Sequence, residues 1–285
     1  MPKILACTDG SAPYSASVYE HAGWAAKRMA ASVEVLHVLD PAREKASVAD
    51  FTGTIGVDAR DELLEQLAEL EAAKAKVAQK KGRLILDDAQ ARLRQLGLAD
   101  VVLTQRHGTL IDTLHELEES ADLVIIGKRG ETHDVAGGHL GANLERAIRS
   151  SRKPVLVASR AFRHISRVLI AFDGSATAKK AVEYAARQPL LKGLRFDVLN
   201  VKPGSKAAPE DLAWAEELLV KGGAEARVVT VDGSPDEAIA AHVNGEAIDL
   251  IVMGAYGHSR IRQLIIGSTT TETIRTCQVP LLMFR

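Results

Sequence analysis

One stretch of the sequence reads Asp249-Leu-Ile-Val-Met-Gly254-Ala-Tyr-Gly257 and, after nine intervening residues, Gly267-Ser268-Thr269-Thr270. Its apolar run is typical of a strand that is buried on both faces. Its glycines let the backbone approach a ligand closely because they carry no Cβ. The hydroxyl residues predict the start of a helix, whose unpaired N–H groups can bind an anion. The stretch therefore predicts a strand, a glycine turn and a phosphate-binding helix N-terminus.

The same layout occurs earlier in the chain, at Asp122-Leu-Val-Ile-Ile-Gly127-Lys-Arg-Gly130, with Gly141 after ten intervening residues. A second motif is also repeated. An apolar run ends in Asp9-Gly-Ser in the first half and in Asp173-Gly-Ser in the second, and Ala-rich helical sequence follows each. Two motifs repeated in the same order indicate an internal duplication.

The two halves also close alike, with apolar strands predicted at 154–158 and 280–284. The chain of 285 residues is therefore predicted to hold two copies of one module, residues 1–160 and 165–285, joined by the basic segment 160–164. Exposed apolar strands at sheet edges invite pairing. We therefore expect the modules to pack against each other as a pseudo-symmetric pair through these last strands.

In the second module, strands are predicted at 167–172, 195–201, 226–231, 248–253 and 280–284, and helices at 176–188, 209–221, 235–244 and 268–276. This alternation predicts an α/β chain of two tandem doubly wound modules, each a five-stranded parallel sheet with helices on both faces. Ligands of such sheets bind at the carboxyl ends of the strands. The Asp-Gly-Ser and glycine motifs both fall there, so they are expected to converge on one edge.

Composition sets limits on function. A formal net charge of −1 gives no reason to expect general affinity for nucleic acid or acidic membranes. The sequence shows neither a membrane-spanning run nor a signal peptide pattern, which predicts a cytoplasmic location. Cys7 and Cys277 lie within element patterns and are interpreted as buried thiols, not as a disulfide.

The first module is about 37 residues longer between its landmarks, and the extra length lies around 41–97. Apolar residues at 63, 64, 67 and 70 predict one helix, and a second is expected from about residue 82 to Leu96. The segment is interpreted as a helical hairpin. A lid or a partner-binding surface is the alternative.

These motifs resemble the universal stress protein family in its two-domain form, over nearly the whole chain. The tandem Asp-Gly-Ser strands, Val38 and Val201 at the ends of second strands, and Gly-x2-Gly-x9-Gly-Ser carry the resemblance. It implies an adenine-nucleotide α-hydrolase-like, Rossmann-like fold, a role in stress survival, and ATP as the ligand, with or without Mg²⁺ and without a dedicated protein metal site. By this resemblance Asp173 and the Val201 backbone would face adenine and ribose. Phosphates would be held by Gly254, Gly257, Gly267 and Ser268, with Thr269 close by.

The first module departs from the family pattern. Its motif residues are Asp9, Val38, Gly127, Gly130 and Gly141. Ala142, however, replaces the expected hydroxyl, and the spacer is ten residues long instead of nine. Losing a hydrogen bond to a charged group costs about 1.5–3 kcal/mol. The expectation is therefore one strong nucleotide site in the second module and a weakened one in the first.

Each motif also has a purely structural interpretation. Gly254 and Gly257 can simply form a tight turn, while Ser268 and Asp173 can cap the helices that follow them. No Walker A loop, Gly-x-Gly-x-x-Gly motif or metal-ligand spacing is present in the sequence, and no nucleophile–base pair stands out. An ATP-binding regulatory protein is the leading hypothesis. A slow ATPase and a nucleotide-independent interaction module are the alternatives, and the sequence does not identify a protein partner.

Overall fold

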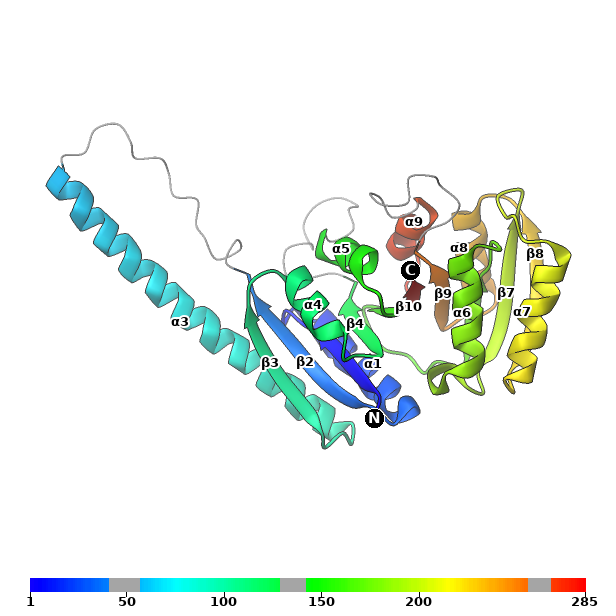
Figure 1. Ribbon diagram of the computed structural model, residues 1–285, viewed down its shortest axis with the longest axis horizontal. Coiled ribbons are helices and arrows are strands. Elements are labelled where there is room, and N and C mark those ends of the chain that lie inside the picture. The colour runs from blue at the N-terminus through cyan, green and yellow to red at the C-terminus, as the bar shows by residue number, and fades with distance from the viewer. Residues whose placement is uncertain (41–56, 129–141, 256–267) are drawn as a thin grey trace.

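The computed structural model describes residues 1–40, 57–128, 142–255 and 268–285 (Figure 1). In the first half the elements are β1 Lys3–Cys7, α1 Tyr14–Met29, β2 Ser32–Leu39, α3 Val57–Gln95, β3 Val101–His107, α4 Leu110–Glu118, β4 Leu123–Gly127, α5 Ala142–Ser150 and β5 Val155–Ala158. In the second half they are β6 Arg167–Ala171, α6 Ala176–Arg187, η1 Pro189–Leu191, β7 Arg195–Lys202, α7 Pro209–Lys221, β8 Glu225–Asp232, α8 Pro235–Gly245, β9 Leu250–Gly254, α9 Ser268–Thr276 and β10 Leu281–Phe284. Every strand and helix expected in the second half is present, with ends shifted by at most two residues.

All ten of these strands join one sheet, in the order β3-β2-β1-β4-β5-β10-β9-β6-β7-β8. Within each half the five neighbouring strands pair in parallel, which confirms the predicted doubly wound sheets. The halves meet at the antiparallel ladder between β5 and β10, where Leu156 lies opposite Leu282. The last strands of the two halves therefore pair within one chain, as their matching apolar sequences predicted.

Helices cover both faces of the sheet. On one face, α1, α3, α6 and α7 bury apolar side chains such as Val18, Leu93 and Leu219. On the other face, α4, α5, α8 and α9 do the same with residues such as Leu114 and Ile274. Runs such as Leu250-Ile-Val-Met253 contribute side chains to the apolar cores on both faces of the sheet, because alternate side chains of a strand point to opposite faces.

The segment between β2 and β3 corrects one expectation. Instead of a helical hairpin, the described part of this segment is the single continuous helix α3, from Val57 to Gln95. Gly82, where the turn was expected, lies inside the helix. A Cβ at Gly82 would come within 2.9 Å of both Gln105 Nε2 and His37 Cδ2, so this glycine allows close packing and does not end the helix. Residues 41–56 of the predicted extra segment lie outside the described residues.

Both cysteines are free and buried, as expected. Burial, together with the nearby Glu34 carboxylate, raises the pKa of the Cys7 thiol to about 12. Among the described residues, no helix has the length and apolar character needed to cross a membrane.

Candidate functional site

The order of strands identifies the edge where a ligand is expected to bind. In the second half the order is β8-β7-β6-β9-β10, so the chain runs outward from β6 to one side and from β9 to the other. This change of direction is the switch point at which doubly wound sheets bind ligands, outside the carboxyl ends of the strands. Asp173 follows β6 and Gly254 ends β9, so both predicted residues flank that point. Val201 lies near the carboxyl end of the neighbouring strand β7.

Asp173 organises a tight turn between β6 and α6. Its Oδ1 accepts a hydrogen bond of 3.0 Å from the Ser175 backbone N–H, and its carbonyl accepts one of 3.2 Å from the Lys206 N–H. Gly174 has a φ of +77°, which favours glycine, and a Cβ there would lie 2.8 Å from the Ala207 Cα. The cap of α6 is Ser175, whose Oγ accepts from the Ala178 N–H at 3.2 Å. The alternative in which Asp173 caps that helix is therefore wrong.

Gly254 lies between two helix starts. An added Cβ would lie 2.5 Å from Thr177 Oγ1, in the first turn of α6. On the other side, Thr270 in the first turn of α9 directs its hydroxyl toward the carbonyl oxygens of Gly254 and Ala255, at 3.4 Å from each. The helix α9 begins at Ser268, as the motif predicted, and Thr269 is half-buried in its first turn. The end of β9 thus lies close to the N-terminal turns of α6 and α9, which carry unpaired N–H groups.

Beside this turn, β7 contributes a buried amide. Val201 is 7% exposed, and its carbonyl accepts from the Ser205 N–H at 3.1 Å. Its neighbour Asn200 is fully buried, and neither atom of its side-chain amide has a hydrogen-bond partner among the described residues. Buried polar atoms are satisfied in most native structures, by protein, water or a ligand.

The first half has the same turn, but a different element packs against it. Asp9 Oδ1 accepts from the Ser11 N–H at 3.0 Å and from its hydroxyl at 2.6 Å. Gly10 has a φ of +78°, and a Cβ there would lie 2.6 Å from the Ile85 side chain of α3. In the first half, helix α3 therefore packs against the glycine of this turn, whereas in the second half the loop that contains Ala207 does so. Val38 lies near the end of β2, and Gly127 ends β4, beside β1.

Several predicted site residues cannot be placed. Gly130, Gly141, Gly257 and Gly267 lie outside the described residues, and so does the side chain of Ser268. The predicted Gly-x2-Gly-x9-Gly-Ser loop is therefore described only at its ends, Gly254 and the start of α9.

Sequence reasoning missed Thr177, Thr270 and Asn200 as neighbours of the site. Thr270 stood within the quoted motif and Asn200 directly before Val201, but no pattern showed that their side chains lie at this edge. Lys128, next to Gly127, donates to the carbonyl of Cys277 in the other half.

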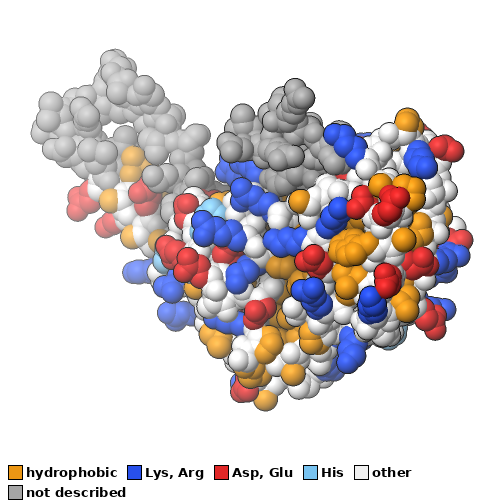
Figure 2. Space-filling model, turned by 45° about the vertical axis from the view of Figure 1, so that its right-hand side comes forward, with side chains coloured by type: hydrophobic (Ala, Val, Ile, Leu, Met, Phe, Trp, Pro, Cys, Tyr) orange, Lys and Arg blue, Asp and Glu red, His pale blue; other side chains and the backbone are white. Residues whose placement is uncertain are grey.

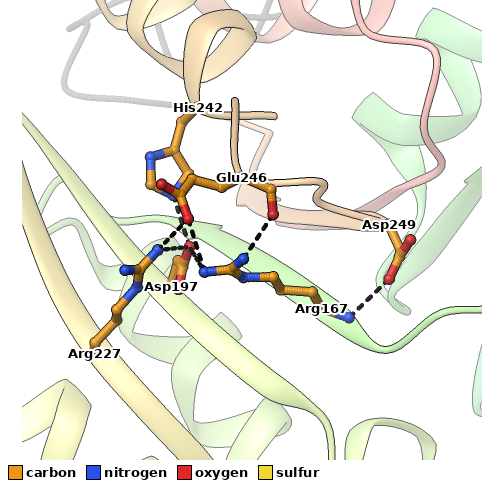
Figure 3. Close-up of polar contacts among 6 residues, drawn as sticks. All are labelled: Arg167, Asp197, Arg227, His242, Glu246 and Asp249. Atoms are coloured by element: carbon orange, nitrogen blue, oxygen red, sulfur yellow. Dashed lines mark hydrogen bonds and ion pairs between the residues drawn. The ribbon is translucent and has the colours of Figure 1, made fainter. Parts of the chain in front are cut away.

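A second polar cluster lies at the amino ends of the strands (Figure 3). Asp197 of β7 has only 3% of its side chain exposed. It accepts from Arg227 at 2.7 and 2.9 Å and contacts His242 Nε2 at 2.8 Å. Arg167 joins it to Glu246, at 2.9 Å. Burial raises the pKa of the Asp197 carboxyl, but the hydrogen bonds and positive charges around it outweigh burial and hold that pKa at about 2.

Asp249, directly before β9, borders this cluster. Its Oδ2 accepts from the backbone N–H groups of Ser166 and Arg167, both at 2.9 Å. The cluster packs between strands and α8 and therefore ties elements together. Nowhere in the described ranges do three or more His, Cys, Asp or Glu residues form a group that could hold a metal ion.

Comparison with known proteins gives a consistent result. The model of the universal stress protein family matches residues 1–159 and 164–285. A universal stress protein of Synechocystis sp. is 41% identical over 288 residues, covering 100% of both chains. A Thermus aquaticus protein described as a universal stress protein is 32% identical over 133 residues, 41% of this chain and 97% of its own. The crystal structure of a universal stress protein from Archaeoglobus fulgidus shares the fold, with a TM-score of 0.71 at 22% identity, over 99% of this chain and 95% of that one.

Proposed function

The chain belongs to the universal stress protein family, and from this we propose that it is an ATP-binding stress-response regulator whose main site lies at the carboxyl edge of its second half. The observation that carries the proposal is the meeting of Asp173, Gly254 and the first turn of α9 at the switch point of the sheet. These three features suit a nucleotide. A carboxylate can accept hydrogen bonds from ribose hydroxyls, a glycine lets the backbone approach the ligand closely, and a helix N-terminus can bind phosphate.

In this proposal the Asp173 carboxylate accepts from ribose, since Oδ1 is already oriented by the Ser175 N–H. The phosphates lie toward Gly254 and the start of α9, where Ser268 and Thr269 follow the predicted glycine loop. The buried amide of Asn200, which has no partner among the described residues, lies next to Val201, where the adenine is expected. Any Mg²⁺ would arrive on the phosphates, because the described residues contain no group of three or more His, Cys, Asp or Glu side chains that could hold it.

Asparagine substitutions in the two matching turns test the proposal. Asp173→Asn keeps the Oδ1 acceptor of the turn but removes the charge, and we expect ATP affinity to fall about 10- to 100-fold, the size of a lost charge-assisted hydrogen bond. Asp9→Asn is the matched control in the first half, which we expect to leave the strong site unchanged. Calorimetry on the full chain measures both, and its stoichiometry should be nearer one than two per chain.

Two results would refute this assignment. One is a wild-type chain that shows no heat of ATP binding and no thermal stabilisation by ATP. The other is equal ATP affinity in Asp173→Asn and wild type while Asp9→Asn loses binding, which would place the strong site in the first half. Phosphate release, measured on the same samples, distinguishes binding from slow hydrolysis.

A further inference from the structure

The helix α3 extends far beyond the body of the protein (Figure 1). Its C-terminal turns pack on α1, β2 and β3 through the buried residues Leu86, Ala89 and Leu93. Residues 65–81 are exposed, apart from Leu67 and Ala78, which are half-buried. The part before Gly82, residues 57–81, is about 37 Å long at about 1.5 Å per residue. A helix without neighbours is marginally stable in water, so a partner that covers one face would stabilise this one.

The projecting part of α3 carries an apolar stripe. Leu70 and Val77 are seven residues apart and are 50% and 68% exposed, and Leu84, just beyond Gly82, continues the same spacing with 61% exposed. Leu67 precedes Leu70 by three residues, the other spacing of a heptad repeat. A stripe of this period matches the seam of a coiled coil, in which each apolar side chain inserts between residues of a facing helix.

The charges of the same segment are separated along its length. Glu65, Glu69 and Glu71 are acidic and exposed. The turns that follow are basic, with Lys74, Lys76, Lys80 and Arg83, all exposed. In Figure 2, acidic, basic and apolar side chains lie along the part of the molecule that projects at the left. A parallel copy of this helix would place like charges together, whereas an antiparallel copy places the acidic part opposite the basic part.

We propose that residues 65–79 of α3 bind the same segment of a second copy of this chain as an antiparallel two-helix coiled coil. Centring the pair near residue 72 places Leu67 opposite Val77 of the second copy. The same register places Lys74 next to Leu70 and Glu71 of that copy. Apolar burial then supplies the attraction, and the separated charges select the antiparallel orientation.

Sedimentation equilibrium of the full chain tests the association. The wild type should be a dimer, and the double variant Leu70→Asp with Val77→Asp should raise the dimer Kd by about a hundredfold or more, because both helices lose apolar contacts. Ala75→Asp adds the same carboxylate to the exposed opposite face and should leave the dimer intact. A wild type that stays monomeric at the highest concentration reached, or a double variant that dimerises like the control, overturns the proposal.

Cysteine substitutions test the orientation, since Cys7 and Cys277 are buried. In the antiparallel pair Leu67 of one copy lies level with Val77 of the other across the seam, whereas the two copies of residue 77 are about 15 Å apart along the axis. Mild oxidation should therefore link the double variant Leu67→Cys with Val77→Cys into a disulfide dimer and leave Val77→Cys alone mostly unlinked, because a disulfide spans only about 4.4–6.8 Å between Cα atoms. Efficient linking of Val77→Cys alone would indicate a parallel pair and refute the antiparallel one.

Discussion

At the scale of single residues, the duplication is visible in two buried carboxylates. Glu34 of β2 lies opposite Leu5, and Asp197 of β7 lies opposite Leu169, at matching positions in the two halves. Each pairs with a cation in the first residue of the neighbouring strand: Lys3 contacts Glu34 at 2.6 Å, and Arg167 contacts Asp197 at 3.4 Å. A buried carboxylate is costly unless it is paired, so each pair favours one register between its strands.

The Asp197 carboxyl makes the free energy of unfolding depend on pH in the acidic range. Its pKa in the folded chain is about 2, below the ordinary 3.8 of an aspartate, so it contributes stability that is present above about pH 4 and is lost as the pH falls toward 2. The contribution is about 1–2 kcal/mol after screening, because Arg227 is half-exposed. Urea unfolding from pH 7 to pH 2 should show this loss in wild type and a smaller one in Asp197→Asn. Parallel pH profiles for the two proteins would contradict this account.

The two Asp-Gly-Ser turns could be predicted from sequence because each is local. Asp9 and Asp173 stand two residues before the serines whose N–H groups they accept, so the motif contains the whole interaction. Thr177 and Gly254, by contrast, are brought together by the pairing of β6 with β9. No local pattern records such a contact, because strand order is set by the whole core.

At the level of elements, α3 shows that a glycine in the sequence does not always end a helix. The sequence Lys80-Lys81-Gly82 suggested a turn, because glycine weakens helices by about 1 kcal/mol. The helix continues because Leu86, Ala89 and Leu93 anchor the turns that follow, and because Gly82 fits closely against His37 and Gln105. Tertiary packing therefore outweighs local propensity at this position, and periodicity alone could not reveal it.

Two glycine substitutions separate these effects. Gly82→Ala gains helix propensity but must displace the ends of Gln105 and His37, and the His37 ring is held by the Thr8 carbonyl at 2.9 Å. We expect no net gain, or a loss of up to about 1 kcal/mol. Gly245→Ala, at the end of α8, meets nothing within 4 Å and should gain about 0.4–1 kcal/mol. Chemical denaturation of both variants measures the contrast, and a similar gain in each would show that Gly82 is not closely packed.

At the scale of the whole molecule, the seam between β5 and β10 joins two five-stranded sheets into one. Its apolar strands were predictable because both halves end in similar sequences. Other contacts across the halves were not, since they join side chains to distant carbonyls. Arg28 of α1 donates to the carbonyls of Leu190 and Lys192, and Arg285 donates to that of Ser150 at 3.1 Å. The boundaries of the two modules, at residues 160 and 165, stay a prediction.

The seam leads to a test with the second half alone. In the full chain β10 pairs with β5, and Leu282 lies opposite Leu156 at the centre of the ladder. A fragment of residues 165–285 exposes the four-residue apolar strand β10, and such an edge favours pairing with another copy. We expect the fragment to dimerise through β10, with Leu282 opposite its own copy.

Because the fragment lacks α3, its association cannot come from the coiled coil, so sedimentation measures association through the exposed edge of β10 alone. In the intact chain β5 is present at an effective concentration of about a millimolar or more, so it outcompetes a second molecule. A folded fragment that remains monomeric at millimolar concentration would show that the pairing of β10 with β5 needs the other contacts between the halves.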